Sequence, residues 1–165
     1  GHASVRIETG DGTVIYIDPW SDVLDGAPGD ADVVFVTHDD FDHYDPDGIE
    51  AVAGDGAVVV AYEGVDTSEL DREVVGLVLS VGDATVYFPS DTDFLDEHAD
   101  IRADVFIPPI GGHYTMDRHE AAEFARSVDP ELVIPVHYNT FEAIETDVDA
   151  FAEELSESGI QVAVI

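Results

Sequence analysis

Short runs of apolar and β-branched residues recur along the chain and are separated by polar, acidic or Gly-containing stretches. Runs of this length between turn residues are typical of β-strands. The pair Asp11-Gly12, between the first two runs, is typical of a tight hairpin turn. The predicted strands are Ser4–Ile7, Thr13–Ile17, Val33–Val36, Ala57–Ala61, Val74–Val81, Thr85–Phe88, Val105–Ile107, Leu132–Val136 and Gln161–Ile165.

Three helices are predicted between the strands. Asp45 can cap the first helix, and Asp117 with Glu120 forms a capping box at the start of the second. Gly159 is a stop signal for the third. The helices are predicted from Pro46, over Arg118–Val128, and from Thr146 through Leu155. Strands that alternate with helices predict an α/β protein whose sheets are covered by helices, and the length favours a single domain, 1–165.

Acidic residues dominate the charged positions. The chain has 38 Asp and Glu against five Lys and Arg, for a formal net charge of -33 at pH 7. At molar salt the Debye length falls to roughly 3 Å, which screens the mutual repulsion of such a surface. We therefore predict a halophilic protein. The 45% of hydrophobic residues argues against an acidic disordered chain.

The composition also bears on partners and location. No basic patch offers an electrostatic footprint for nucleic acid, so we expect no nucleic-acid partner. Because the chain has no cysteine, any metal has to be bound by His, carboxylate or water. No apolar run reaches transmembrane length and no signal-peptide pattern begins the sequence, so we expect a cytoplasmic protein without a membrane partner. Whether it forms a homo-oligomer stays open.

Four potential metal ligands fall within six residues directly after the predicted strand Val33–Val36. They are His38, Asp40, Asp42 and His43 of the segment Thr37-His38-Asp39-Asp40-Phe41-Asp42-His43. A turn at the end of a strand can direct such side chains to one point, whereas a regular strand or helix would spread them over several faces. The spacing predicts a metal site. The alternative is an Asp-rich loop in an Asp-rich protein, with incidental histidines.

Two further candidates occupy equivalent places in the pattern. Asp91 follows the predicted strand Thr85–Phe88, and His137 closes the predicted strand Leu132–Val136. Ligand-binding groups in α/β proteins gather beyond the carboxyl ends of strands. Taken alone, an Asp after a strand is more often a turn residue, and a single His is more often structural. Their weight comes from joining the first cluster.

The segment His38-x-Asp40-x-Asp42-His43 resembles the His-x-His-x-Asp-His signature of the metallo-β-lactamase superfamily, with Asp40 in place of the second histidine. Two later segments are similar to a subgroup of metal-dependent hydrolases related to the ascorbate-6-phosphate lactonases, and the acidic composition resembles a haloarchaeal-type member. The resemblance covers nearly the whole chain and implies a four-layer αββα sandwich with its metals at one edge of the two sheets. The segments that carry it are Gly1-His2-Ala3-Ser4, Ile17-Asp18-Pro19, Pro109-Ile110-Gly111-Gly112-His113-Tyr114-Thr115-Met116 and Pro135-Val136-His137-Tyr138-Asn139-Thr140-Phe141.

The resemblance also implies a role for each candidate position. His38 and Asp40 would be ligands of the first metal, and Asp91 would bridge the two. The second metal would take Asp42, His43 and His137. Asp18 would orient a ligand histidine, as metal sites usually require. Positions that could contact the substrate or support the ligands are His113, Tyr114, Asn139, Asp18 and His2.

One ligand of the family pattern is absent. The remaining first-site histidine should lie between the predicted strand Ala57–Ala61 and Asp91, and no histidine occurs between His43 and His98. Relatives of this kind carry a few tens of residues more at that point. We hypothesise that a segment is missing near Arg72 to Val75.

These observations predict a metal-dependent hydrolase that uses a metal-activated water on a small ester, lactone or phosphorylated substrate. Asp42 or Asp91 would orient the water or take its proton. We expect one or two divalent ions, zinc or manganese, with iron as a further candidate because a carboxylate at Asp40 makes the site harder. One alternative is a non-catalytic metal-binding or scaffold protein with a degraded first metal site. Another, ranked last, is a metal-dependent nuclease or phosphodiesterase.

Overall fold

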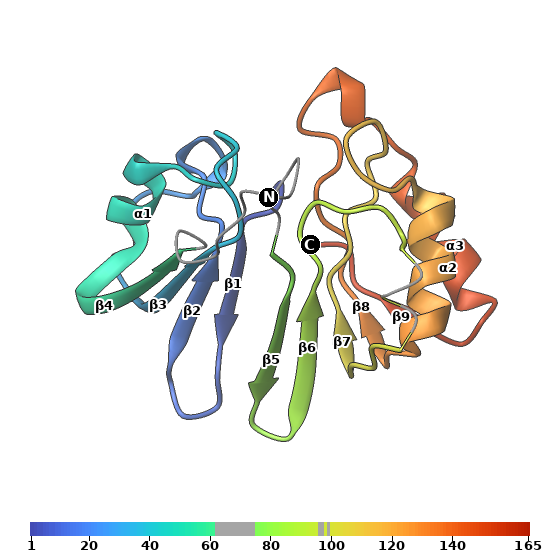
Figure 1. The fold of residues 1–165 in the computed structure, drawn as a ribbon, viewed down its shortest axis with the longest axis horizontal. Helices are drawn as coiled ribbons and strands as arrows, with labels where there is room; N and C mark the ends of the chain where they lie inside the picture. The colour runs from blue at the N-terminus through green and yellow to red at the C-terminus, as the bar shows by residue number, and fades with distance from the viewer. Residues whose placement is uncertain (62–74, 96–97, 99) are drawn as a thin grey trace, which may run out of the picture. The chain divides into compact units, whose positions relative to one another are not determined.

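The computed structural model describes residues 1–61, 75–95, 98 and 100–165. They form two compact units, of which unit 1 is Gly1 and Ala3–Val75, and unit 2 is His2 and Gly76–Ile165. Each unit has its own β-sheet and its own helix or helices (Figure 1). The prediction of a single domain, 1–165, stays a prediction.

Unit 1 contains a mixed four-stranded sheet in the order β1-β2-β3-β4. The first pair is antiparallel and the other two pairs are parallel. Helix α1 packs on this sheet, where Val52 joins the buried cluster of Val14, Tyr16, Ala31 and Val34. The elements are β1 (Val5–Glu8), β2 (Val14–Ile17), η1 (Ser21–Val23), β3 (Ala31–Val36), α1 (Pro46–Val52) and β4 (Ala53–Ala61).

Helix α1 begins and strand β4 ends near the predicted metal ligands. The Asp45 carboxylate caps α1 by accepting a hydrogen bond of 3.0 Å from the Asp47 N–H, which confirms the predicted cap. Strand β4 starts directly after α1 and is longer than predicted. It is an edge of its sheet among the described residues, and Val58, Val59 and Val60 are 57%, 47% and 45% exposed. An apolar run of this kind is typical of a buried strand, so its exposure was not predictable from the pattern.

Unit 2 contains a mixed five-stranded sheet in the order β5-β6-β7-β8-β9. The β5–β6 pair is antiparallel and the remaining pairs are parallel. Helices α2 and α3 cover one face of this sheet (Figure 1) and bury Phe106, Phe124, Phe151 and Leu155 in the core between them. The elements are β5 (Leu77–Val81), β6 (Ala84–Phe88), β7 (Val105–Phe106), α2 (Arg118–Val128), β8 (Leu132–Val133), η3 (Glu142–Ile144), α3 (Val148–Ser156) and β9 (Gln161–Val162).

Both predicted helices of unit 2 are confirmed. Helix α2 spans the predicted residues, and both halves of its capping box form: Asp117 accepts from the Glu120 N–H at 3.0 Å, and Glu120 accepts from the Asp117 N–H at 2.9 Å. Helix α3 is capped by Asp147. Gly159, in the left-handed region at φ 81°, follows its last turn.

Strands β5, β7, β8 and β9 are shorter than predicted, and β6 is one residue longer. For β8 the reason is visible in the sequence. Strand β8 ends at Val133, because Pro135 has no N–H to continue a ladder. Val136 still forms an isolated parallel bridge with Pro109, so His137 does follow a strand-like segment. The hypothesised missing segment near Arg72 to Val75 lies outside the described residues except for Val75. Within the described residues, no helix has the length and apolar character needed to cross a membrane.

Candidate functional site

The two predicted histidine ligands of unit 1, His38 and His43, lie close to a buried carboxylate, Asp18, which directly follows β2. Its Oδ1 accepts a hydrogen bond from the Thr37 N–H at 2.8 Å. Its Oδ2 accepts from the Thr37 hydroxyl at 2.6 Å and lies 2.8 Å from His43 Nδ1. Asp18, Thr37, His38 and His43 are all nearly or completely buried. One carboxylate therefore joins the end of β2 to the loop after β3.

This network sets the protonation of both histidine rings. Because the Thr37 hydroxyl donates its proton to Asp18, its oxygen can only accept from His38 Nδ1, 3.0 Å away. A carboxylate is an acceptor as well, so His43 Nδ1 also carries hydrogen. The lone pair of each neutral ring is then on Nε2. The two rings lie 3.9 Å apart between centroids, which brings two potential metal-ligating nitrogens together.

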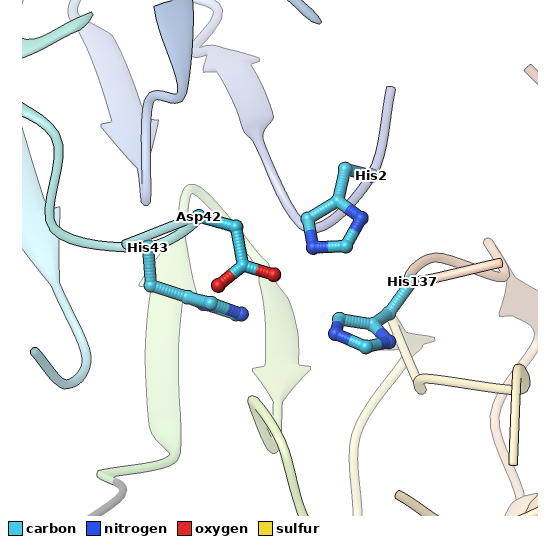
Figure 2. A group of neighbouring side chains, drawn as sticks. All are labelled: His2, Asp42, His43 and His137. Atoms are coloured by element: carbon cyan, nitrogen blue, oxygen red, sulfur yellow. The ribbon is translucent and has the colours of Figure 1, made fainter. Parts of the chain in front are cut away.

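The carboxylates of the loop lie beside these nitrogens. Asp40 Oδ2 is 3.5 Å from His38 Nε2, and the Asp40 side chain is 55% exposed. Two ligands of one tetrahedral ion at about 2.0–2.1 Å would be separated by roughly 3.3 Å, so this pair fits a shared ion. Asp42, which is buried, lies next to His43 on the loop after β3 (Figure 2). The donor atoms of Asp42 and His43 lie within 4.8 Å of each other.

The predicted ligands of unit 2 form a second group. His137 Nε2 lies 3.2 Å from Asp91 Oδ2, again the separation expected of two ligands on one ion. His2 and His137 lie side by side (Figure 2), with their ring centroids 4.3 Å apart. The His137 N–H donates to the His2 carbonyl at 3.1 Å, and His2 Nδ1 lies 2.7 Å from the Thr140 hydroxyl. His2, Asp91 and His137 are thus brought together by backbone and side-chain contacts.

Unusual backbone conformations mark these positions. Seven described residues other than glycine have positive φ, and all but Asp129 are predicted site residues or lie next to one. The left-handed region costs an ordinary residue roughly 1–2 kcal/mol, and such strain tends to concentrate at functional sites. The seven are His2 (52°), Asp18 (45°), Ser90 (61°), His113 (65°), Asp129 (57°), His137 (54°) and Asn139 (57°).

Two glycines permit close backbone approach at the same places. A Cβ on Gly48 would lie 2.1 Å from the carbonyl oxygen of Pro19, the residue after Asp18. A Cβ on Gly111 would lie 2.4 Å from the carbonyl oxygen of His137. No side chain fits at either distance, so the backbones that carry Asp18 and His137 are each packed against a glycine.

The remaining predicted positions are more peripheral. His113 and Tyr114 are exposed, with their rings in edge contact at 4.4 Å. Asn139 is exposed as well, and its side-chain oxygen accepts from the Thr146 N–H at 2.8 Å. Burial raises the pKa of the neighbouring Tyr138 above its ordinary value.

Two residues of the site were not singled out from the sequence. Thr37 relays the hydrogen bond from His38 to Asp18, and Thr140 contacts His2. Thr37 ends an apolar run immediately before the first proposed ligand, His38. That position was the signal in the sequence that could have identified Thr37 as a site residue. Nothing in the local pattern distinguishes Thr140 from an ordinary loop threonine.

Comparison with known proteins identifies relatives along the whole chain. The model of the beta-lactamase superfamily domain matches residues 1–137. A UPF0173 metal-dependent hydrolase of Methanosphaerula palustris is 33% identical over 208 residues, which cover 100% of this chain and 94% of the relative. Another from Salinibacter ruber is 31% identical and covers 99% and 93%. Since this chain has 165 residues, these alignments include residues of the relatives that have no counterpart here.

Solved structures with the same fold include metal-dependent hydrolases, as the sequence relatives do. Igni18, a metallo hydrolase from Ignicoccus hospitalis, aligns with a TM-score of 0.82 at 25% identity and covers 100% of this chain and 92% of its own. A putative metal-dependent hydrolase from Parabacteroides distasonis aligns with a TM-score of 0.78 at 23% identity, over 98% and 97%. The predicted α/β metallo-β-lactamase fold, with mixed sheets flanked by helices, is confirmed.

Proposed function

We propose a specific hydrolytic function from the premise that this chain belongs to the beta-lactamase superfamily and, within it, to the UPF0173 metal-dependent hydrolases. It is a metal-dependent hydrolase. The proposed substrate is a small molecule with an ester, lactone or phosphorylated group, and no nucleic acid. His38, Asp40, Asp42 and His43 of unit 1, and Asp91 and His137 of unit 2, are the proposed ligands.

The observation that carries this proposal is the hydrogen-bond network around Asp18. It gives both His38 and His43 a tautomer that can bind a metal, with Nδ1 protonated and Nε2 able to coordinate. Asp18 itself accepts three hydrogen bonds, so most of its lone-pair sites are occupied. We therefore assign Asp18 to positioning the histidines and leave it out of the ligand set.

The chain's own carboxylates would handle the proton of the attacking water. A bound divalent ion supplies Lewis acidity and lowers the pKa of a coordinated water from 15.7 to about 7. Asp42 is buried beside His43, and Asp91 lies against His137 with a side chain that is 15% exposed. Either carboxylate can orient the water and accept its proton. The buried surroundings of His38, His43 and His137 exclude competing solvent from the ligand atoms.

We propose zinc or manganese as the metal, with iron as a further candidate, and one or two ions per chain. Asp40 contributes a carboxylate at 3.5 Å from His38 Nε2, where the superfamily signature has an imidazole. A carboxylate is a harder ligand and moves the preference from zinc toward manganese or iron.

Elemental analysis of protein purified without chelator, followed by His→Ala substitutions, tests the ligand assignment. We expect one or two ions per wild-type chain, and reduced content in His43→Ala and in His137→Ala. His119→Ala is the matched control, because the His119 side chain is 62% exposed and pairs with Glu154. Equal metal content in all four proteins would contradict the assignment.

Turnover distinguishes the hydrolase from its main rival. The sequence lacks a histidine between His43 and His98, which would favour a non-catalytic metal-binding protein if the first site were degraded. A hydrolase shows saturable, chelator-sensitive cleavage across a panel of esters, lactones and phosphoesters, and loses it in Asp42→Ala. Metal-dependent stability without cleavage of any panel member would instead support the rival.

We also propose that the acidic surface adapts the protein to high salt. A net charge of -33 on 165 residues destabilises the compact state through self-repulsion when screening is weak. We expect the melting temperature to rise steadily between 0.1 M and about 3 M KCl, because the Debye length shrinks from roughly 10 Å to under 3 Å. A melting temperature that does not change with salt would contradict this.

A further inference from the structure

A cleft of about 700 Å³ lies in unit 1 immediately beside the predicted ligand loop. Two of its lining residues, Asp39 and Tyr44, belong to that loop. Asp39 is covalently between His38 and Asp40, and Tyr44 directly follows His43, so the cleft begins one residue from three of the proposed ligands. Consecutive Cα atoms are about 3.8 Å apart, so the backbone of this wall continues directly into the backbone that carries those ligands.

The other walls are one face of α1 and one face of β4. Pro46, Ile49 and Glu50 line the cleft from α1, and their spacing of three and four residues puts them on the same side of the helix. Val59 and Ala61 line it from β4, and their spacing of two puts them on the same face of the strand. The lining is therefore apolar along the strand and at Pro46 and Ile49 of the helix, with Glu50 as a charged residue on the same helix face.

The charge of the cleft is negative. Asp39 and Glu50 contribute carboxylates to its lining. Arg6 is the one Arg or Lys among the described residues of unit 1, and it is bound to Glu8 at 3.0 Å and to Asp30 at 2.8 Å. Among the described residues that line the cleft, none would neutralise an anionic group, which would instead meet the like charge of Asp39 and Glu50. An uncharged apolar group would cover the exposed side of Val59 and the ring of Tyr44.

We propose that this cleft binds an uncharged, apolar arm of the substrate, an acyl or alkyl chain of an ester or lactone. The inference rests on the proposed hydrolase function and narrows its substrate class, since it disfavours phosphorylated or carboxylated molecules at this position. Val59 of β4 and Ile49 of α1 determine the preference for chain length, and Asp39 and Glu50 disfavour anions.

The kinetic test uses the metal-loaded full chain with p-nitrophenyl acetate, butyrate and hexanoate, and with p-nitrophenyl glutarate as the anionic analogue. We expect kcat/KM to rise about fourfold for each methylene that the cleft buries. We expect the glutarate ester to react at least roughly fivefold more slowly than the butyrate ester, as a like charge about 4 Å from a carboxylate in water implies.

Two neighbouring valines of β4 provide a matched pair of variants. Val59→Asp introduces a charge inside the cleft and should lower the ratio of hexanoate to acetate cleavage by roughly tenfold, the loss of one to two buried methylenes. Val58→Asp makes the same chemical change on the opposite face of the strand, at a residue that is 57% exposed, and should keep the wild-type ratio. Equal effects in the two variants, or no dependence on chain length in the wild type, would overturn the proposal.

A binding measurement separates this inference from the proposed function. Saturation-transfer NMR with 1-hexanol, which has no bond to hydrolyse, should show transfer to the alcohol from the wild type and from Val58→Asp, and none from Val59→Asp. If no ester is cleaved but this pattern appears, the hydrolytic proposal fails and the cleft stands. If esters are cleaved but the wild type shows no transfer, the cleft proposal is overturned and the hydrolase stands.

Discussion

Replacement of Asp18 by Asn tests the physical basis of the site, because the change alters proton donors and acceptors without altering shape. Asp18 is completely buried and accepts from the Thr37 N–H, from the Thr37 hydroxyl and from His43 Nδ1. An amide offers one oxygen and one NH₂ group. In one orientation the NH₂ faces the Thr37 N–H, and in the other it faces both the hydroxyl and the His43 ring.

The second orientation reverses the network. The Thr37 hydroxyl would then accept from Asn and donate to His38 Nδ1, and His43 Nδ1 would have to accept as well. Both rings would carry their hydrogen on Nε2, where a metal has to bind. A hydrogen bond to a charged group contributes about 1.5–3 kcal/mol and a neutral one about 0.5–1.5 kcal/mol, so replacing the two at Oδ2 by neutral ones costs about 2–3 kcal/mol. Burial of the neutral amide is easier than burial of a carboxylate and offsets part of this.

We expect Asp18→Asn to weaken metal binding by roughly 10–100-fold, the usual effect of removing a group that orients a ligand histidine. Competition with a chromophoric chelator measures the affinity, and ¹⁵N NMR of the imidazoles of metal-free protein reports the tautomers directly. Asp32→Asn is the control, because among the described residues Asp32 accepts one hydrogen bond, from the Val14 N–H at 2.8 Å. Affinity within about twofold of wild type, with Nδ1–H signals unchanged for both rings, would refute the reasoning.

Two further changes test the packing and the charge of the fold. Gly111→Ala should lower the free energy of unfolding, measured by urea titration, by roughly 1–3 kcal/mol or more, because its Cβ would lie 2.4 Å from the His137 carbonyl oxygen. Gly10→Ala is the control and should not lower it, because the space around its Cβ is open. The hydrogen bond from Arg6, strengthened by the Arg6 charge, holds the pKa of Asp30 below its ordinary value of about 3.9. The stabilisation by the Asp30–Arg6 pair is therefore full above pH 3.9 and is lost as the pH falls through the depressed pKa of Asp30. The Asp30→Asn variant should be less stable than wild type at pH 7 and equally stable in strong acid. A stability difference that grows on acidification would contradict this sign.

The helix boundaries illustrate what local sequence determines. The capping box of Asp117 and Glu120 predicted the start of α2, and Asp45 before Pro46 predicted the start of α1, because a cap is an interaction between residues two or three positions apart. Strand positions were predictable for the same reason, since their alternating or continuous apolar character is local. The ends of the strands were less predictable. The apolar pattern extended β8 past Ile134, but Pro135 has no N–H to continue the hydrogen bonding of the strand.

The candidate ligands could be proposed from the sequence, whereas the contacts between them could not. The spacing of His38, Asp40, Asp42 and His43 after a strand is a local signal. The network that prepares the histidines is not, because Asp18 is 19 residues from Thr37 and 25 from His43. Only the parallel pairing of β2 with β3 brings the ends of these two strands together.

The sequence by itself therefore determined where the main helices and strands form, which residues are candidate metal ligands and how strongly the surface is charged. These properties depend on short-range patterns and composition. The tertiary structure alone decided the tautomers of His38 and His43, because both depend on Asp18, which is 19 residues from Thr37 and 25 residues from His43. It also decided that the apolar strand β4 is exposed at the edge of its sheet. An apolar run favours burial, but the strand neighbours that could cover it are a property of the whole fold.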